Sequence, residues 1–142
     1  MIASLTVRSA ELAIAFYQSA FGFELEFIMP GPDGRVAHAQ MTFHDGRIMF
    51  SPEGAYGSEL QAPASSGREG PMQQYVYCPD VDALTERARN AGATVVSEPA
   101  IMFWGDRMAT FLDPDGYRWA FATNVAEFDP AQMPDAGYAA QT

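Results

Sequence analysis

Alternating polar and apolar residues open the chain. Residues 4–7, Ser-Leu-Thr-Val, place two apolar side chains on one face, which predicts a half-buried strand. Ser9 then stands in the N-cap position of a helix over residues 10–17, where apolar side chains recur at helical spacing. Gly22 is expected to end the helix, because glycine adopts the left-handed backbone conformation common at that position.

Three further strands complete the first half of the chain. Their apolar runs cover residues 24–29, 35–43 and 47–50. Turn-forming residues separate them at 30–34, Pro-Gly-Pro-Asp-Gly, and at 45–46, Asp-Gly. The first half therefore has the predicted order strand, helix, strand, strand, strand.

The same order begins again after a segment rich in Pro, Gly and Ser at residues 51–70. A strand at 73–78 precedes a helix over 81–90, with Asp80 in the N-cap position and Gly92 beyond its end. Three more predicted strands follow, around residues 94–96, 108–112 and 117–122.

The two halves align with one another as a duplication. Ala39 lies as far ahead of the Asp45-Gly46 turn as Ala109 lies ahead of the Asp115-Gly116 turn. We therefore predict one α+β domain built of two tandem β-α-β-β-β modules. The module boundaries are 1–52 and 71–126, with a connecting loop at 53–70 and an acidic, loosely ordered tail at 127–142.

Composition narrows the classes of function. The 142 residues suffice for one domain with a buried core, and the formal net charge of -10 disfavours binding to nucleic acid or to a membrane surface. Cys78 is the only cysteine, so the chain forms no internal disulfide, and its apolar neighbours predict a buried small residue. The N-terminus shows neither a signal peptide nor a membrane-spanning run, so the expected location is cytoplasmic.

Local motifs carry a resemblance to a known family. They are Val7-Arg8-Ser9, residues 13–17 and 21–23, 79–83, 91–93, 104–107, Asp113-Pro114-Asp115-Gly116 and Tyr117-Arg118-Trp119. With these motifs the chain resembles the vicinal oxygen chelate superfamily of glyoxalases, bleomycin-resistance proteins and extradiol dioxygenases. That resemblance implies paired modules that curl into a curved mixed sheet, open and barrel-like, around a cavity, with the helices on the outer face. It also implies a homodimer, since members often complete their cavities by pairing modules.

Enzymes of this superfamily generally hold a divalent metal through His, Gln and Glu side chains. The matching positions here are Ile2, Phe50 and Ala120, none of which can coordinate a metal, and Gln73, whose neutral amide is a poor anchor by itself. We therefore expect no cofactor, and a divalent metal is not supported by these positions.

Strand alternation then predicts the lining of a ligand cavity. For Phe50 a place in the closed core is an equal alternative. Trp104 either roofs a pocket or anchors the core, in the second case with Asp106 and Arg107 as a local ion pair. His38 is a hydrogen-bond partner or a general base only if its strand face lines the cavity. The predicted ligand-binding residues are His38, Gln40, Phe50, Gln73, Tyr75, Tyr77, Trp104 and Arg118.

Three classes of function follow from this pattern. The first is a small-molecule-binding protein that sequesters a drug or metabolite, as the bleomycin-resistance branch does. The second is a lyase, isomerase or dioxygenase that uses a metal through unrecognised ligands or works without one. The third is an interaction module, which would show no small-molecule saturation.

Overall fold

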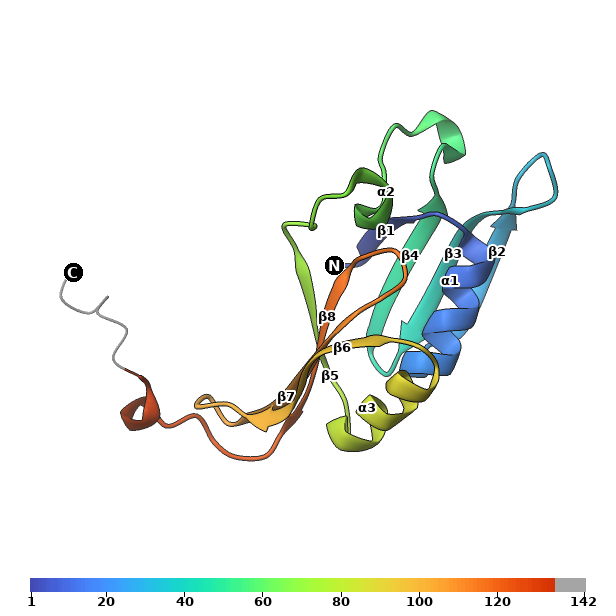
Figure 1. Ribbon diagram of the computed structural model, residues 1–142. Coiled ribbons are helices and arrows are strands. Elements are labelled where there is room, and N and C mark those ends of the chain that lie inside the picture. The colour runs from blue at the N-terminus through green and yellow to red at the C-terminus, as the bar shows by residue number, and fades with distance from the viewer. Residues whose placement is uncertain (135–142) are drawn as a thin grey trace.

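The computed structural model describes residues 1–134 and shows two modules of the same design (Figure 1). Each module is a four-stranded mixed sheet, ordered β1-β4-β3-β2 in the first and β5-β8-β7-β6 in the second. The first module contains β1 (Ala3–Val7), α1 (Ala10–Phe16), a π-helical turn (Tyr17–Phe21), β2 (Glu24–Pro30), β3 (Val36–Phe43) and β4 (Gly46–Pro52).

The second module repeats this order and confirms the predicted duplication. Its elements are β5 (Gln73–Tyr77), α3 (Val81–Asn90), β6 (Thr94–Ile101), β7 (Asp106–Leu112) and β8 (Arg118–Asn124). The connecting loop contains a 3-10 turn (Ala55–Gly57) and α2 (Pro63–Ser66), and a 3-10 turn (Pro130–Gln132) lies in the tail. The rest of the predicted tail, residues 135–142, lies outside the described residues.

The helix ends have the predicted caps. The Ser9 hydroxyl accepts a hydrogen bond from the Leu12 amide at 3.3 Å, and the Asp80 carboxylate accepts one from the Ala83 amide at 3.1 Å. Gly22 has a φ of 81°, the left-handed conformation predicted for the residue that ends the first helix.

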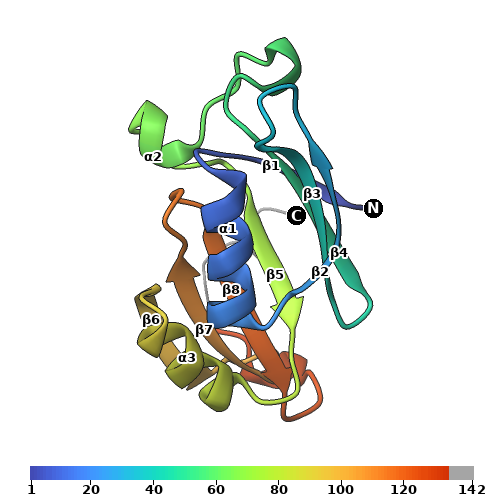
Figure 2. The ribbon, with the colours of Figure 1, turned by 90° about the vertical axis from the view of Figure 1, so that its right-hand side faces the viewer.

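Helices α1 and α3 lie on the same side of the two sheets (Figure 2), and one aromatic core joins the faces that they cover. Tyr17 and Phe21, in the π-helical turn, lie between them. The Tyr17 ring is 5.7 Å from the Phe50 ring of the first sheet and 5.4 Å from the Trp119 ring of the second, while Phe21 is 4.7 Å from Phe121. Burial of side chains of this size contributes about 1.5–3 kcal/mol each, so this core holds the two modules together.

Polar contacts reinforce the junction between the modules. The buried Tyr17 hydroxyl donates to the Asp113 carboxylate at 2.6 Å, and the Trp119 indole donates to the same oxygen at 2.9 Å. The Tyr117 hydroxyl donates to the Thr6 carbonyl at 2.8 Å, which ties β1 to the turn that precedes β8. The opposite face of each sheet is left open, and we call these two surfaces the open faces.

Candidate ligand-binding site

The open face of the second sheet is built of rows of side chains that run across neighbouring strands. Tyr75 of β5 pairs with Ala120 of β8, which pairs with Thr110 of β7. In the next row Tyr77 pairs with Ala122. Because paired residues share a face, these side chains lie together, away from the helix-covered core. Asp106, paired with Asn124, begins the following row.

Asp106 is the centre of this face. One of its carboxylate oxygens accepts hydrogen bonds from the Tyr75 hydroxyl at 2.6 Å, the Tyr77 hydroxyl at 2.8 Å and the Trp104 indole at 3.1 Å. The other oxygen accepts one from the Asn124 amide at 3.0 Å. Asp106 is 1% exposed, so the carboxylate lies beneath the side chains that donate to it.

The hydrogen bonds shift the pKa values of the groups in this cluster. Burial raises the pKa of Asp106, but the bonds from Tyr75, Asn124, Tyr77 and Trp104 together hold it below its ordinary value, so the group is ionised at neutral pH. Burial and its bond to Asp106 raise the pKa of Tyr75 to about 12, and a separate bond from Tyr77 to Asp106, together with burial, raises the pKa of Tyr77. Both tyrosines therefore act as hydrogen-bond donors and are poor general bases.

Two small residues allow this arrangement. Tyr75 and Tyr77 stand on β5, and their hydroxyls reach across β8 to Asp106 on β7. The strand they cross carries alanines at 120 and 122, which leave room for rings to lie over them. Neither alanine has exposed surface, whereas Tyr75 is 41% and Tyr77 58% exposed. The result is an aromatic surface with a carboxylate beneath it.

Thr110, in the Tyr75 row, has a buried hydroxyl without a partner among residues 1–134. Thr110 is 7% exposed, and its Oγ1 atom makes no hydrogen bond within the described part of the chain. A buried hydroxyl left unpaired costs about 1–3 kcal/mol. The oxygen has no exposed surface, so it weakens the packing of this sheet and offers no contact to a ligand.

The other predicted ligand-binding residues lie in three separate places. Gln73 and Arg118 pair with each other at the far end of the same open face, where Arg118 contacts Glu69 at 3.4 Å. His38 and Gln40 lie on the open face of the first sheet. Phe50 is fully buried in the core, on the opposite face of β4, so the alternative of a core position holds for it.

The open face of the first sheet forms its own polar contacts. The Nδ1 atom of His38 lies 3.3 Å from the Ser51 hydroxyl, and its ring lies 6.0 Å from that of Phe27. The Gln40 amide donates to Glu26 at 3.2 Å. Sequence-predicted ligand residues therefore occur on both open faces, but only Tyr75, Tyr77 and Trp104 converge on one group.

The residues at the family's metal positions do not fit a metal. Ala120 offers no ligand atom, and Phe50 faces the core. Among residues 1–134, no three His, Cys, Asp or Glu side chains gather in a way that could hold a metal ion. The Asp106 oxygens already accept four hydrogen bonds and lie beneath aromatic side chains, so this carboxylate does not replace the missing ligands.

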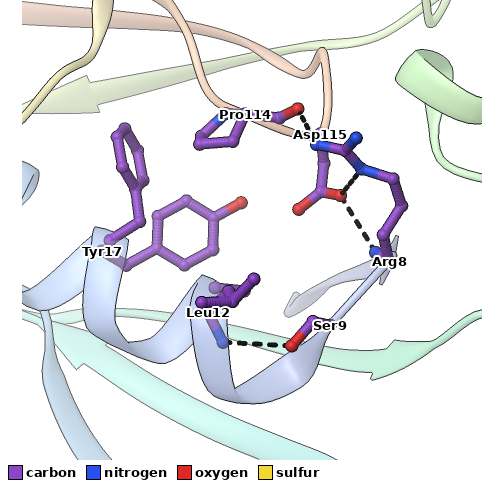
Figure 3. Close-up of a pocket in the computed structure, with 8 residues that line it drawn as sticks. Arg8, Ser9, Leu12, Tyr17, Pro114 and Asp115 are labelled. Atoms are coloured by element: carbon purple, nitrogen blue, oxygen red, sulfur yellow. Dashed lines mark hydrogen bonds and ion pairs between the residues drawn. The ribbon is translucent and has the colours of Figure 1, made fainter.

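A pocket beside α1 belongs to the junction of the modules (Figure 3). It measures about 240 Å³, and Arg8 lies across it from Tyr17. The Arg8 side chain is held by Asp115 at 3.1 Å and by the Pro114 carbonyl. Typical ligand pockets start at about 300 Å³. Since its polar side chains already bond one another, we assign this pocket to the structure of the junction.

Asp106 was not predicted from the sequence as a site residue. The sequence suggested it only as an ion-pair partner of Arg107, yet Arg107 points to the other face and pairs with Asp82 at 2.8 Å. The signal was present, because Ala109 and Phe111 are core residues and alternation then places 106, 108 and 110 on the open face.

Comparison with known proteins agrees with the fold. The model of the Glyoxalase/Bleomycin resistance protein/Dioxygenase superfamily matches residues 2–121. The uncharacterized protein Mb0911c of Mycobacterium bovis is 36% identical over 125 residues, which cover 87% of this chain and 82% of that protein. The chain belongs to this superfamily.

Solved structures show the same fold. TioX from Micromonospora sp. ML1 is similar with a TM-score of 0.71 and 26% identity, over 88% of this chain and 98% of that one. A glyoxalase/bleomycin resistance protein/dioxygenase family enzyme from Burkholderia phytofirmans PsJN gives a TM-score of 0.68 and 22% identity, over 87% and 97% of the chains. No helix within residues 1–134 is long and apolar enough to cross a membrane.

Proposed function

We propose that this protein binds a small organic molecule on the open face of the second sheet, without the metal centre typical of its superfamily. The observation that carries the proposal is the convergence of the Tyr75 and Tyr77 hydroxyls and the Trp104 indole on the Asp106 carboxylate, with the rings of both tyrosines partly exposed. Aromatic walls with a few oriented polar groups are the usual composition of a ligand site.

We further propose that two copies of the chain enclose the ligand. Each sheet has an open face with large apolar side chains, such as Phe27 at 43% exposure on the first and Tyr77 at 58% on the second. A two-fold dimer that opposes the first sheet of one copy to the second sheet of the other would cover both faces at once. Sedimentation equilibrium tests this: Phe27→Asp should yield monomers, whereas Leu12→Asp, exposed on α1 at 73%, should leave the dimer intact.

An enzyme is the alternative function. The contact between the His38 imidazole and the Ser51 hydroxyl favours it, since a base beside a hydroxyl is the first requirement for an activated nucleophile. The structure describes no third group that orients His38, and Tyr75 keeps its proton at neutral pH. We therefore propose binding as the function, and turnover of a ligand found by screening would instead support catalysis.

The experiment uses Trp104 as a reporter. Its indole donates to the Tyr75 hydroxyl at 3.0 Å, so a ligand on these rings should change its fluorescence. The protein is titrated in chelator with a panel of cationic, neutral and anionic aromatic molecules. We expect saturable binding of one molecule per chain, with the signal lost in Trp104→Phe. Absence of saturation by every compound would refute the proposal and favour an interaction module.

A further inference from the structure

The carboxylate of Asp106 is buried and ionised but has no cationic partner among residues 1–134. All four of its hydrogen-bond donors are neutral side chains. The neighbouring Arg107 points away and makes two bonds of 2.8 Å to Asp82 on the other face. None of the ion pairs formed by residues 1–134 includes Asp106. Buried charges are normally paired, so this charge requires an explanation.

The hydrogen-bond donors around Asp106 make the electrostatic potential at the surface above it more negative. A phenol that donates a hydrogen bond to a carboxylate gains electron density in its ring, which strengthens the negative potential above the ring face. Tyr75 and Tyr77 both do so, and large parts of their rings are exposed. The Trp104 indole, the ring type that attracts cations best, donates to the same oxygen.

We propose that the ligand of this site carries a weakly hydrated organic cation, an alkylated or protonated amine, held against Tyr75, Tyr77 and Trp104 above the Asp106 carboxylate. This inference rests on the proposed binding function and names its ligand class. The cation is attracted by the ring faces and, through space, by the carboxylate.

The chemistry of the cluster excludes a bare metal ion as that cation. A divalent metal needs direct oxygen or nitrogen ligands, and the Asp106 oxygens are covered by their donors. An amine with apolar substituents loses little hydration on an aromatic surface and needs no direct ligand. The formal net charge of -10 also favours the approach of a cation.

The test compares two probes of the same shape, (4-hydroxyphenyl)trimethylammonium and its neutral carbon analogue 4-tert-butylphenol. Dissociation constants are measured by calorimetry with the full chain in chelator. We expect the cation to bind at least about tenfold more tightly, equal to about 1.4 kcal/mol. Asp106→Asn should remove most of that preference. Asp82→Asn, which deletes the same charge from the opposite face, should leave it unchanged.

A second variant covers the case in which Asp106→Asn fails to fold. Tyr77 is 58% exposed, so Tyr77→Leu removes a ring of the cluster with little loss of packing, and it should also reduce the preference for the cation. Equal affinities for the two probes, or a preference that survives both variants, would overturn the cation assignment while the binding function stands. If neither probe binds at millimolar concentration, the assignment fails, and the broader fluorescence panel decides separately whether the protein binds any small molecule.

Discussion

Replacing Thr110 with valine should make the ligand-free protein more stable. Valine has nearly the shape of threonine and removes a buried hydroxyl that finds no partner in the described residues. An unpaired buried hydroxyl costs about 1–3 kcal/mol, so removing it should raise the free energy of unfolding by about 1 kcal/mol. For a chain of this length that corresponds to a melting temperature higher by about 3 °C. Urea unfolding followed by circular dichroism measures the change.

Thr123→Val is the matched control. The Thr123 hydroxyl donates to the Cys78 carbonyl at 3.0 Å and accepts from the Val81 amide at 2.9 Å, so the same substitution there should cost about 1–2 kcal/mol. If Thr110→Val destabilises the protein as Thr123→Val does, the Thr110 hydroxyl has a partner in the free protein and the reasoning fails.

Three further predictions concern the junction, a turn and the Asp106 cluster. Tyr17→Phe removes a buried bond to the Asp113 carboxylate and should lower the free energy of unfolding by about 2 kcal/mol in urea titration. Gly105→Ala should cost more than about 2 kcal/mol, since Gly105 has a φ of 97° and an added Cβ atom would overlap the Ala126 carbonyl oxygen. Tyr77→Phe removes a bond that holds the pKa of Asp106 down against burial. A carboxylate whose pKa is lower in the folded than in the unfolded protein stabilises the fold at pH values above the unfolded pKa, and this stability is lost in acid. The loss of unfolding free energy in Tyr77→Phe should therefore be largest at neutral pH and shrink below about pH 4 in urea titrations.

Each of these predictions has a control within the chain. Tyr56 is 72% exposed, so Tyr56→Phe should change stability little at any pH. Gly34 has a φ of 79° but open space around its added Cβ atom, so Gly34→Ala should cost less than Gly105→Ala. Equal losses of stability in Gly34→Ala and Gly105→Ala, or in Tyr56→Phe and Tyr17→Phe, would contradict the corresponding interaction. A loss in Tyr77→Phe that is constant with pH would contradict the coupling to Asp106.

Most of the fold could be predicted from the sequence because its signals are local. Caps at Ser9 and Asp80 and glycine at 22 define the helix ends through contacts within one turn. The Asp-Gly turns made the duplication visible. Strand ends were less certain: β6 continues to Ile101 through Pro99, which is tolerated on an edge strand because no ladder bond is needed on its outer side.

The site could be predicted only in part because it depends on pairing between distant strands. Alternation correctly placed Tyr75 and Tyr77 on one face. Phe50 was assigned to the cavity as well as to the core, since a shift of one residue reverses the faces of a strand. The side chains that bond Asp106 come together only when β5, β8 and β7 lie side by side. The sequence instead suggested an ion pair between Asp106 and its neighbour Arg107, which pairs with Asp82 in the structure.

The central claim is that this protein has a ligand site that works without the superfamily's metal. The most direct test measures the metal content of the purified protein, together with thermal unfolding in chelator and in added Ni²⁺, Mn²⁺, Fe²⁺ and Zn²⁺. A metal held by the native state alone must raise the free energy of unfolding, by about 2.7 kcal/mol when the metal concentration is a hundred times the dissociation constant. The melting temperature rises with it. We expect metal well below one ion per chain and the same melting temperature in every condition. One tightly held ion per chain, with a melting temperature that falls in chelator and recovers on adding metal, would contradict the account.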